Sequence, residues 1–238
     1  KDPIFLNKAL LINSSLSKTM IDNNIIRHTS SSPAEVLFFE DYSYYIDALI
    51  GLYEITFDEK YLKFADELTV FSNEKFKEES GFYRFSTNQE SLFADTLINL
   101  QDGVTPSANS VMNFNLFRLG HFNGNKEYLL HSKTMINNVS ETIKDRVTDH
   151  LLWLNNSHNY SQKFYEIAIS GNNAIGKAEE VMEEYLPNAL VAASKSESEL
   201  YLLKDRYFKD ETYIYVCVDN TCKFPVTKVS KALELMKD

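Results

Sequence analysis

The sequence predicts a mainly α-helical fold of helical hairpins, followed by a small C-terminal α/β subdomain. Three observations predict it: a short motif that recurs at helix starts, apolar residues at helical spacing, and strand-like runs after residue 160. Of the 238 residues 44% are hydrophobic, enough to bury a substantial core, and the low number of Gly and Pro suits packed helices. We place the boundary between residues 1–160 and 161–238.

The recurring motif has three copies, which are Asp2–Ala9, Asp58–Ala65 and Asn125–Ser132. Each copy begins with Asp or Asn, continues after two spacers with an aromatic residue and Leu, and ends with a small residue. The first side chain can cap a helix, the apolar pair begins the buried stripe, and the small residue lets a neighbouring helix approach. Each copy therefore opens a helix, and the later two follow another helix after a short turn.

Apolar periodicity gives the order of the helices. Residues 3–21 form one helix, the second of an earlier hairpin, and residues 41–75 and 107–144 each form a complete hairpin. A last helix covers residues 147–157. The long segment between the two complete hairpins includes a short strand or hairpin at residues 81–85. Stacked hairpins form either an open solenoid or a closed ring, and the periodicity does not choose between them.

The C-terminal segment has the pattern of a βαβ unit. A strand at residues 164–169 precedes a helix at residues 175–185 and a second strand at residues 189–193. Alternating residues at 213–218 predict a third strand, and residues 228–237 predict a closing helix.

Charge and hydropathy exclude several kinds of partner. The net charge of −10 repels phosphate backbones, so we expect no nucleic-acid partner. No apolar run is long enough to span a bilayer, so we expect no membrane partner either. The opening Lys1-Asp2-Pro3 has neither an initiator Met nor a signal-peptide pattern, and we expect a piece of a longer cytoplasmic polypeptide. Histidine spacing predicts no metal site, and we expect no cofactor.

Five motifs occur in a fixed order along the chain: Glu40-Asp41-Tyr42, Ile50–Glu54, Asp102–Ser110, Tyr215–Cys217 and Cys222–Thr227. Together they resemble the C-terminal region of the thioredoxin-domain-containing family of the YyaL and spermatogenesis-associated type. The resemblance implies a thioredoxin-like domain elsewhere in the polypeptide. It also implies that this chain is part of an (α/α)6 toroid similar to N-acylglucosamine 2-epimerase and six-hairpin glycosidases, and so favours a ring over a solenoid.

The sequence departs from the family pattern at two places. Ala108 replaces the usual Gly of the Pro-Ser-Gly-Asn-Ser run. The family's Arg-Pro-Lys-Asp corresponds by register to Thr96, Leu97, Ile98 and Asn99, none of which is charged. If the basic residues hold an anionic or polar ligand, this chain has lost that contact.

Three residues are candidate catalytic groups: Asp41, Asp102 and His28. Asp41 stands at the predicted start of an inner helix, one end of which would face the cavity of a ring, and Asp102 precedes the next inner helix. Two carboxylates about 5 to 10 Å apart serve glycosidases, whereas epimerases need a base, often His, near the reacting carbon. The alternatives are a helix cap for Asp41 and a simple turn for Asp102.

Five further residues are candidate substrate-binding groups: Glu40, Tyr42, Ser107, Asn109 and Ser110. Glu40 and Tyr42 flank Asp41. The hydroxyl and amide groups of the other three gather at a helix start, where they suit hydrogen bonds to a sugar. Their alternative role is to cap the helix and satisfy the backbone of the loop.

Cys217 and Cys222, the only cysteines, match the tail of the family and are candidate redox residues. Our first interpretation is a reduced pair with a packing or turn role, because disulfides are rare in the cytosol. A local disulfide, or a redox relay with the thioredoxin-like domain, is the alternative. The pair lacks the further ligands that a zinc site needs.

Two hypotheses of function follow. The first is a carbohydrate-processing or carbohydrate-binding toroid whose partner is a sugar, with epimerase-like or glycosidase-like activity left open. The alternative is a non-catalytic interaction or redox-partner module for the thioredoxin-like domain. A polar cavity lined by Asp41 and Asp102 would favour the first hypothesis.

Overall fold

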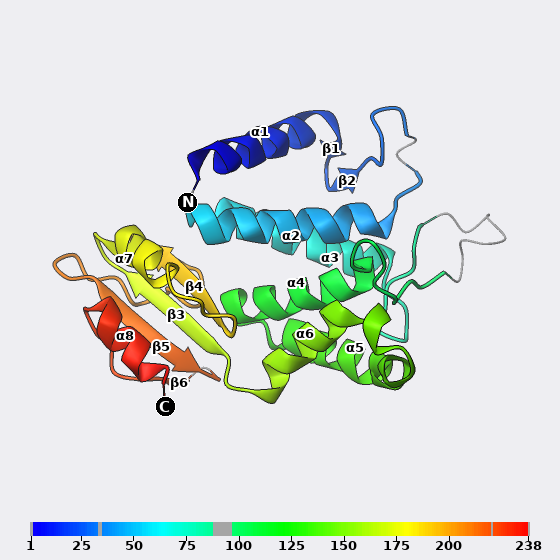
Figure 1. The fold of residues 1–238 in the computed structure, drawn as a ribbon. Coiled ribbons are helices and arrows are strands. Elements are labelled where there is room, and N and C mark those ends of the chain that lie inside the picture. Colours follow the sequence, from blue (N-terminus) through cyan, green and yellow to red (C-terminus); the bar gives the residue numbers. More distant parts are fainter. Residues whose placement is uncertain (1, 33–34, 88–96, 220, 238) are drawn as a thin grey trace.

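The computed structural model describes residues 2–32, 35–87, 97–219 and 221–237 and has a mainly α-helical fold, as predicted (Figure 1). Its N-terminal part contains α1 (Pro3–Thr19), β1 (Ile21–Asp22), β2 (Ile25–Ile26), α2 (Phe39–Thr56), α3 (Lys60–Lys75), α4 (Ala108–Asn123), α5 (Lys126–Asp145), a 3₁₀ turn (Val147–Asp149) and α6 (Leu151–Ser161). Its C-terminal part contains β3 (Tyr165–Ser170), α7 (Ala174–Val181), β4 (Ala189–Ser194), β5 (Tyr213–Val218), β6 (Thr221–Cys222) and α8 (Val229–Leu235).

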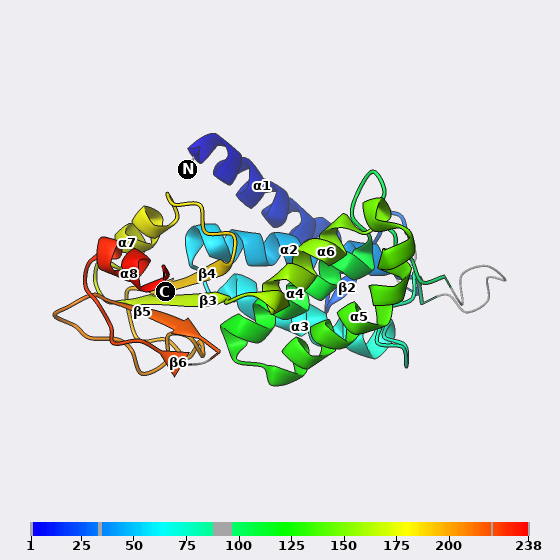
Figure 2. The ribbon, with the colours of Figure 1, turned by 60° about the horizontal axis from the view of Figure 1, so that its bottom comes forward.

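The helical part consists of two hairpins side by side. α2 packs against α3, α4 packs against α5, and α2 and α4 also pack against each other. α2, α4 and α6 all begin at the same end of the molecule (Figures 1 and 2). The hairpins predicted at residues 41–75 and 107–144 are therefore confirmed, within two residues at each end.

The recurring motif caps helices as predicted. The Asp2 carboxylate accepts a hydrogen bond from the Ile4 amide at 2.9 Å, and the Asn125 side chain accepts one from the Glu127 amide at 3.0 Å. Asp58 acts one residue before the assigned cap of α3 and accepts from the Lys60 amide at 3.2 Å. Each acceptor satisfies an amide that the first turn of a helix leaves unpaired.

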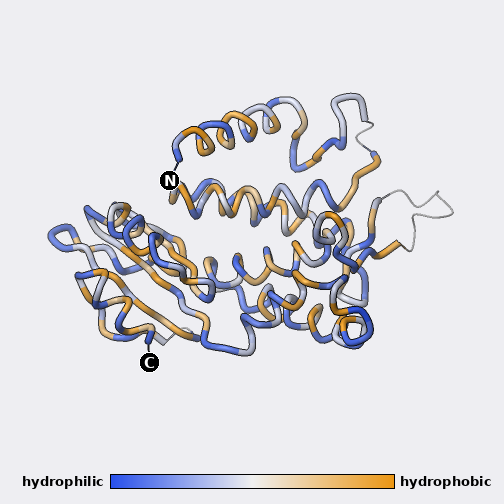
Figure 3. The backbone as a smooth tube through the Cα atoms, viewed as in Figure 1, coloured by the Kyte–Doolittle hydropathy of each residue, from blue (hydrophilic) through white to orange (hydrophobic). Residues whose placement is uncertain are grey.

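α1 lies along α2 but contributes no fully buried residue. Apolar and polar residues are mixed along it (Figure 3), and Phe5 and Leu11 keep about 70% of their surface exposed. An apolar groove of about 340 Å³ separates the two helices near Leu16 and Leu52. None of the helices within the described residues combines the length and apolar character needed to traverse a lipid bilayer.

The C-terminal sheet has the strand order β4-β3-β5-β6. β3 and β4 are parallel and joined through α7, which confirms the predicted βαβ unit, and β5 pairs antiparallel with β3. All six residues of β3 are buried, as expected of a strand covered on both faces. α7 and α8 pack against the strands and against each other.

Several details differ from the sequence-based expectation. The helix predicted at residues 147–157 begins four residues later, as α6, and Val147–Asp149 form a separate 3₁₀ turn. Residues 81–85 form no regular strand, only isolated bridges such as that between Lys77 and Tyr83. β1 and β2 form a small hairpin that apolar periodicity missed. Its turn residues, Asn23 and Asn24, have φ of 48° and 67°, a conformation that Asn tolerates better than most residues, so the Asn-Asn pair was the available signal.

Candidate functional site

A pocket of about 210 Å³ lies where the start of α2 meets the segment that leads into α4. Aromatic rings, amides and hydroxyls line it together with one carboxylate. The lining residues are Phe39, Glu40, Tyr44, Tyr83, Phe85, Asn99, Gln101, Gly103, Val104, Thr105, Pro106, Ser107, Ala108 and Asn109. Three of the predicted site residues, Glu40, Ser107 and Asn109, are thus brought together.

Side chains of α2 hold one wall of the pocket in place. The Tyr44 hydroxyl donates a hydrogen bond to the Pro106 carbonyl, and the Ser43 hydroxyl donates to the Ala108 carbonyl at 2.7 Å. Sequence reasoning missed Tyr44. The available signal was its spacing from Glu40, because residues four apart share one face of a helix.

His28 and Asp41 form a pair beside this pocket. The Nδ1 atom of His28 lies 3.0 and 3.1 Å from the two Asp41 carboxylate oxygens, and the His28 side chain is 45% exposed. Its Nε2 atom makes no hydrogen bond to the part of the chain that the structure describes. Burial raises the pKa of the Asp41 carboxyl, and the hydrogen bond from His28 opposes this rise. An imidazole held at one nitrogen and free at the other can transfer a proton.

Aromatic rings connect the pair to the pocket. The His28 ring lies 4.9 Å from the Phe38 ring, which in turn lies 5.5 Å from Phe85 in the pocket wall. Asp41 follows Glu40 directly along α2. The candidate base and the pocket therefore sit at the same helix end, separated by the Phe38 and Phe85 rings.

Both carboxylate oxygens of Asp102 accept hydrogen bonds from the protein, whereas a catalytic carboxylate needs an oxygen that faces the ligand. Its Oδ1 accepts from the Ser107 amide at 2.9 Å and from the Ser110 hydroxyl at 2.7 Å, and its Oδ2 accepts from the Leu152 amide at 2.8 Å. Both oxygens are thus engaged by the starts of α4 and α6, and the residue does not line the pocket. Asp102 therefore caps two helix starts, a role that the predicted alternative of a simple turn did not include, and neither Asp41 nor Asp102 lines the pocket.

The polar side chains of Ser107, Asn109 and Ser110 also make hydrogen bonds within the protein. The Ser107 hydroxyl accepts from the Ser110 amide at 3.0 Å and caps α4. The Asn109 amide accepts from the Tyr83 backbone N–H at 2.8 Å and donates to the carbonyls of Tyr83 and Asn99 at 2.9 and 3.1 Å. Ser107 and Asn109 line the pocket, and their hydrogen bonds hold this part of its wall in place.

Tyr42 lies in the core instead of the pocket. Its side chain is fully buried, and its hydroxyl accepts from the Ile26 amide and donates to the Asn24 carbonyl, both at 3.0 Å. Burial raises the pKa of Tyr42 to about 12. Tyr42 therefore holds the β1–β2 hairpin against α2. Its position next to Asp41 in the sequence did not reveal this role.

The positions that correspond to the family's Arg-Pro-Lys-Asp run lie in different environments. Thr96 lies outside the described residues. Leu97 is half exposed, Ile98 packs against the core, and Asn99 lines the pocket. An uncharged Asn99 therefore takes the place at the wall where the resemblance implied a charge.

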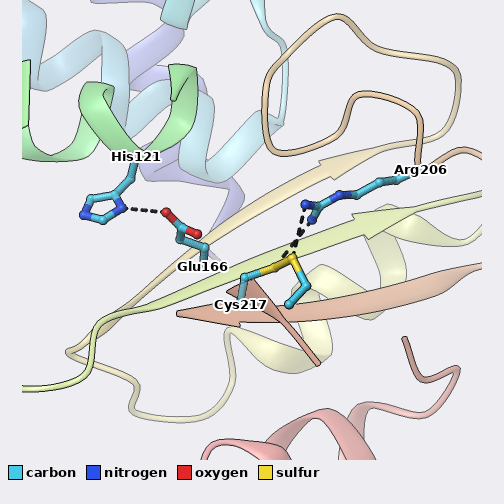
Figure 4. Close-up of a disulfide and its surroundings, with 5 residues drawn as sticks. His121, Glu166, Arg206 and Cys217 are labelled. Atoms are coloured by element: carbon cyan, nitrogen blue, oxygen red, sulfur yellow. Dashed lines mark hydrogen bonds and ion pairs between the residues drawn. A yellow bond between two sulfur atoms is a disulfide. The ribbon is translucent and has the colours of Figure 1, made fainter. Parts of the chain in front are cut away.

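Cys217 and Cys222 form a disulfide between β5 and β6, so the interpretation as a reduced pair is wrong for this structure (Figure 4). The β5–β6 pairing brings their Cα atoms to 3.9 Å, close enough for a bond that sequence separation alone did not decide. Arg206 points at the two sulfurs, and a buried His121–Glu166 pair lies nearby (Figure 4).

Comparison with known proteins supports one part of the resemblance. No protein-family profile matches the chain. Human spermatogenesis-associated protein 20 is 26% identical over 214 residues, which cover 84% of this chain and 27% of the relative, and the mouse protein is 24% identical over 213 residues. An uncharacterised protein of Caenorhabditis elegans is 31% identical over 106 residues, 44% of this chain and 14% of the relative. The chain thus spans about a quarter of the length of the spermatogenesis-associated relatives, and over most of its own length it is similar to spermatogenesis-associated protein 20.

Proposed function

We propose that this chain forms part of the wall of an (α/α)6 toroid that binds and processes a carbohydrate, in the manner of N-acylglucosamine 2-epimerases. The observation that carries the proposal is the His28–Asp41 pair at the helix end that also forms the pocket of Glu40 and Tyr44. A base with a free nitrogen beside a hydroxyl-lined and aromatic-lined pocket suits proton transfer on a hydroxylated ligand.

The packing of the helices supports a ring wall. In such a ring the inner helices run parallel, and each pairs with an antiparallel outer helix. α2, α4 and α6 run parallel, with α3 and α5 as the partners of the first two (Figure 1). Asp102 joins the starts of α4 and α6, which places the ends of two inner helices at one level.

The pocket suits a ligand of monosaccharide size. Its volume of about 210 Å³ is smaller than the pockets of about 300 Å³ or more that hold drug-sized molecules. The Tyr44 and Phe85 rings offer faces for the C–H groups of a sugar ring, and the Glu40 carboxylate can accept hydrogen bonds from hydroxyls.

The chemistry proposed for the pair is an epimerisation next to a carbonyl group. His28 Nε2 removes a proton from the carbon, and the electron pair moves onto the carbonyl oxygen. His28 passes this proton to solvent, and a proton from solvent adds to the opposite face of the carbon and restores the carbonyl. Asp41 orients the imidazole through Nδ1 and stabilises its charged form. Because the Phe38 and Phe85 rings separate His28 from the pocket, the reacting carbon lies on the part of the ligand that projects from the pocket past Phe38.

The test is a panel of monosaccharides and N-acylated sugars added to the chain, with binding read by ligand-observed NMR and isomer formation read by chiral chromatography. Glu40→Gln should weaken binding about tenfold, the loss of one charged hydrogen bond. Asp41→Asn should retain binding but lower isomer formation by at least about 100-fold. His158→Gln, on an exposed His of α6, is the matched control and should change neither. Sugar binding unaffected by Glu40→Gln, together with isomer formation unaffected by Asp41→Asn, would exclude this site.

A second candidate function is a non-catalytic interaction or redox-partner module for a thioredoxin-like domain of the same polypeptide. The observation in its favour is the disulfide between Cys217 and Cys222, which lies in the C-terminal sheet, with Arg206 pointing at both sulfurs. The structural use of the Asp102 and Asn109 side chains also fits a scaffold better than a set of catalytic groups.

A further inference from the structure

The two cysteines of the disulfide differ in exposure. Cys217 lies on β5 and is 1% exposed, whereas Cys222 lies on β6 at the edge of the sheet and is exposed. Thiol–disulfide exchange requires an incoming thiolate to reach one sulfur and expel the other. Access therefore selects Cys222 as the sulfur attacked and Cys217 as the sulfur expelled.

Arg206 lies beside both sulfurs and can stabilise a thiolate on either of them. Its Nη1 lies 3.7 Å from the Cys217 Sγ and its Nη2 lies 3.3 Å from the Cys222 Sγ (Figure 4). The guanidinium is also held over the Tyr215 ring, 4.9 Å from its centre. A neutral disulfide is a weak acceptor, whereas a thiolate beside Arg is strongly stabilised. The arrangement fits the reduced pair better than the oxidised one.

The sheet register completes this environment. Glu166 on β3 stands directly opposite Cys217, so both side chains lie on one face of the sheet. The buried Glu166 carboxylate is held by His121 of α4, with 2.7 Å between Oε1 and Nδ1. The Glu166 carboxylate is thus paired with His121 of the helical part, and the Arg206 guanidinium contacts both sulfurs.

We propose that Cys217–Cys222 is a reversible redox site that is reduced by an external dithiol through attack at Cys222, with Arg206 stabilising the Cys217 thiolate. The proposal deepens, and rests on, the second candidate function. The incoming thiolate bonds to the Cys222 sulfur, the disulfide bond breaks, and its electron pair leaves on Cys217. The second thiol of the reductant, deprotonated, then displaces Cys222 and closes the reductant's own disulfide. Two electrons pass to the chain, and the released sulfurs take up protons from solvent according to their pKa.

The β5–β6 pairing keeps the couple reversible. The Lys223 amide donates to the Val216 carbonyl at 3.0 Å, so a backbone hydrogen bond joins the two segments in addition to the disulfide. The reduced thiols therefore stay adjacent, and an oxidant can close them again without a search.

The first test uses the whole 238-residue chain in mixtures of reduced and oxidised dithiothreitol at pH 7, with free thiols trapped by a maleimide and counted by mass. The readout is unambiguous because the chain has two cysteines. Wild type should be reduced while its circular dichroism stays native. Arg206→Gln should lower the equilibrium constant for reduction about tenfold, which corresponds to about 30 mV. Arg206→Lys should restore most of this loss, and Lys209→Gln, which removes an exposed charge elsewhere, should change nothing.

The second test identifies the attacked sulfur. Cys222 in the Cys217→Ser variant should form a mixed disulfide with oxidised glutathione at least about tenfold faster than Cys217 in the Cys222→Ser variant. Reduction that requires unfolding, an Arg206→Gln variant equal to wild type, or equal reactivity of the two cysteines would each overturn the proposal. If these tests succeed but a thioredoxin-like domain reduces the chain no faster than dithiothreitol, the redox site stands and the second candidate function fails.

Discussion

Replacing Asp102 with Ala is the sharpest test of the way the helical part is held together. The Asp102 carboxylate accepts from two backbone amides, those of Ser107 and Leu152, and from the Ser110 hydroxyl. The two amides stand at the starts of α4 and α6, so one side chain joins two helices across 50 residues of sequence. Asp102→Ala removes both acceptors at once.

The expected cost follows from these contacts. Each amide that loses its capping acceptor costs about 1 kcal/mol. The Ser110 hydroxyl adds little, because it also lies 2.9 Å from the Ser107 carbonyl and can keep that acceptor. The sum is a loss of about 2 kcal/mol in the free energy of unfolding, or about 4 to 8 °C in Tm for a chain of this size. Asp102→Asn keeps one carbonyl oxygen and should lose about half as much.

The assay is urea unfolding followed by far-ultraviolet circular dichroism, with Asp210→Ala as a control on an exposed Asp. The control should change the free energy of unfolding by less than about 0.5 kcal/mol. If Asp102→Ala is as stable as the control, the reasoning that assigns this carboxylate to capping is refuted, and a role in the chemistry of the pocket regains support.

Two further predictions use the same unfolding assay. Gly171→Ala should lower the free energy of unfolding by about 3 kcal/mol, because Gly171 has a φ of +132° and an added Cβ would meet the Glu211 carbonyl oxygen at 2.5 Å. Gly51→Ala, inside α2, should raise it by up to about 1 kcal/mol, because an added Cβ there meets nothing within 4 Å. Equal effects of the two substitutions would contradict this reasoning. Burial lowers the pKa of His131, so the unfolded chain takes up the proton first and stability falls as the pH drops below about 6.5. His131→Gln should flatten this dependence and His158→Gln should not, and a slope that survives His131→Gln would remove burial of this ring as its cause.

Much of the secondary structure could be predicted because its causes are local. Asp2 and Asn125 each accept from an amide two residues further along the chain, and the buried stripe of α5 follows from apolar residues three and four positions apart. Such interactions join neighbours in sequence, so a repeated motif is sufficient to recognise them. The β1–β2 hairpin was missed although its cause is also local, because its signal lay in the Asn23-Asn24 turn and not in apolar spacing.

The candidate site was only partly predictable. Sequence reasoning selected His28 and Asp41 separately, and the fold brought them together across 13 residues. It selected Asp102 for chemistry, but the structure turned both of its oxygens toward helix starts. Position in a motif marked the end of the molecule where the pocket lies, whereas the direction of each side chain depended on packing.

By itself the sequence determined the mainly helical class, the two hairpins, the capped helix starts and the βαβ unit. Only the tertiary structure decided the His28–Asp41 pair, the bridge from Asp102 to Leu152, and the contact of Arg206 with both sulfurs of the Cys217–Cys222 disulfide. The physical reason is that backbone propensity, capping and periodicity act over a few residues, while these polar contacts join segments that meet only when the helices and the sheet have packed.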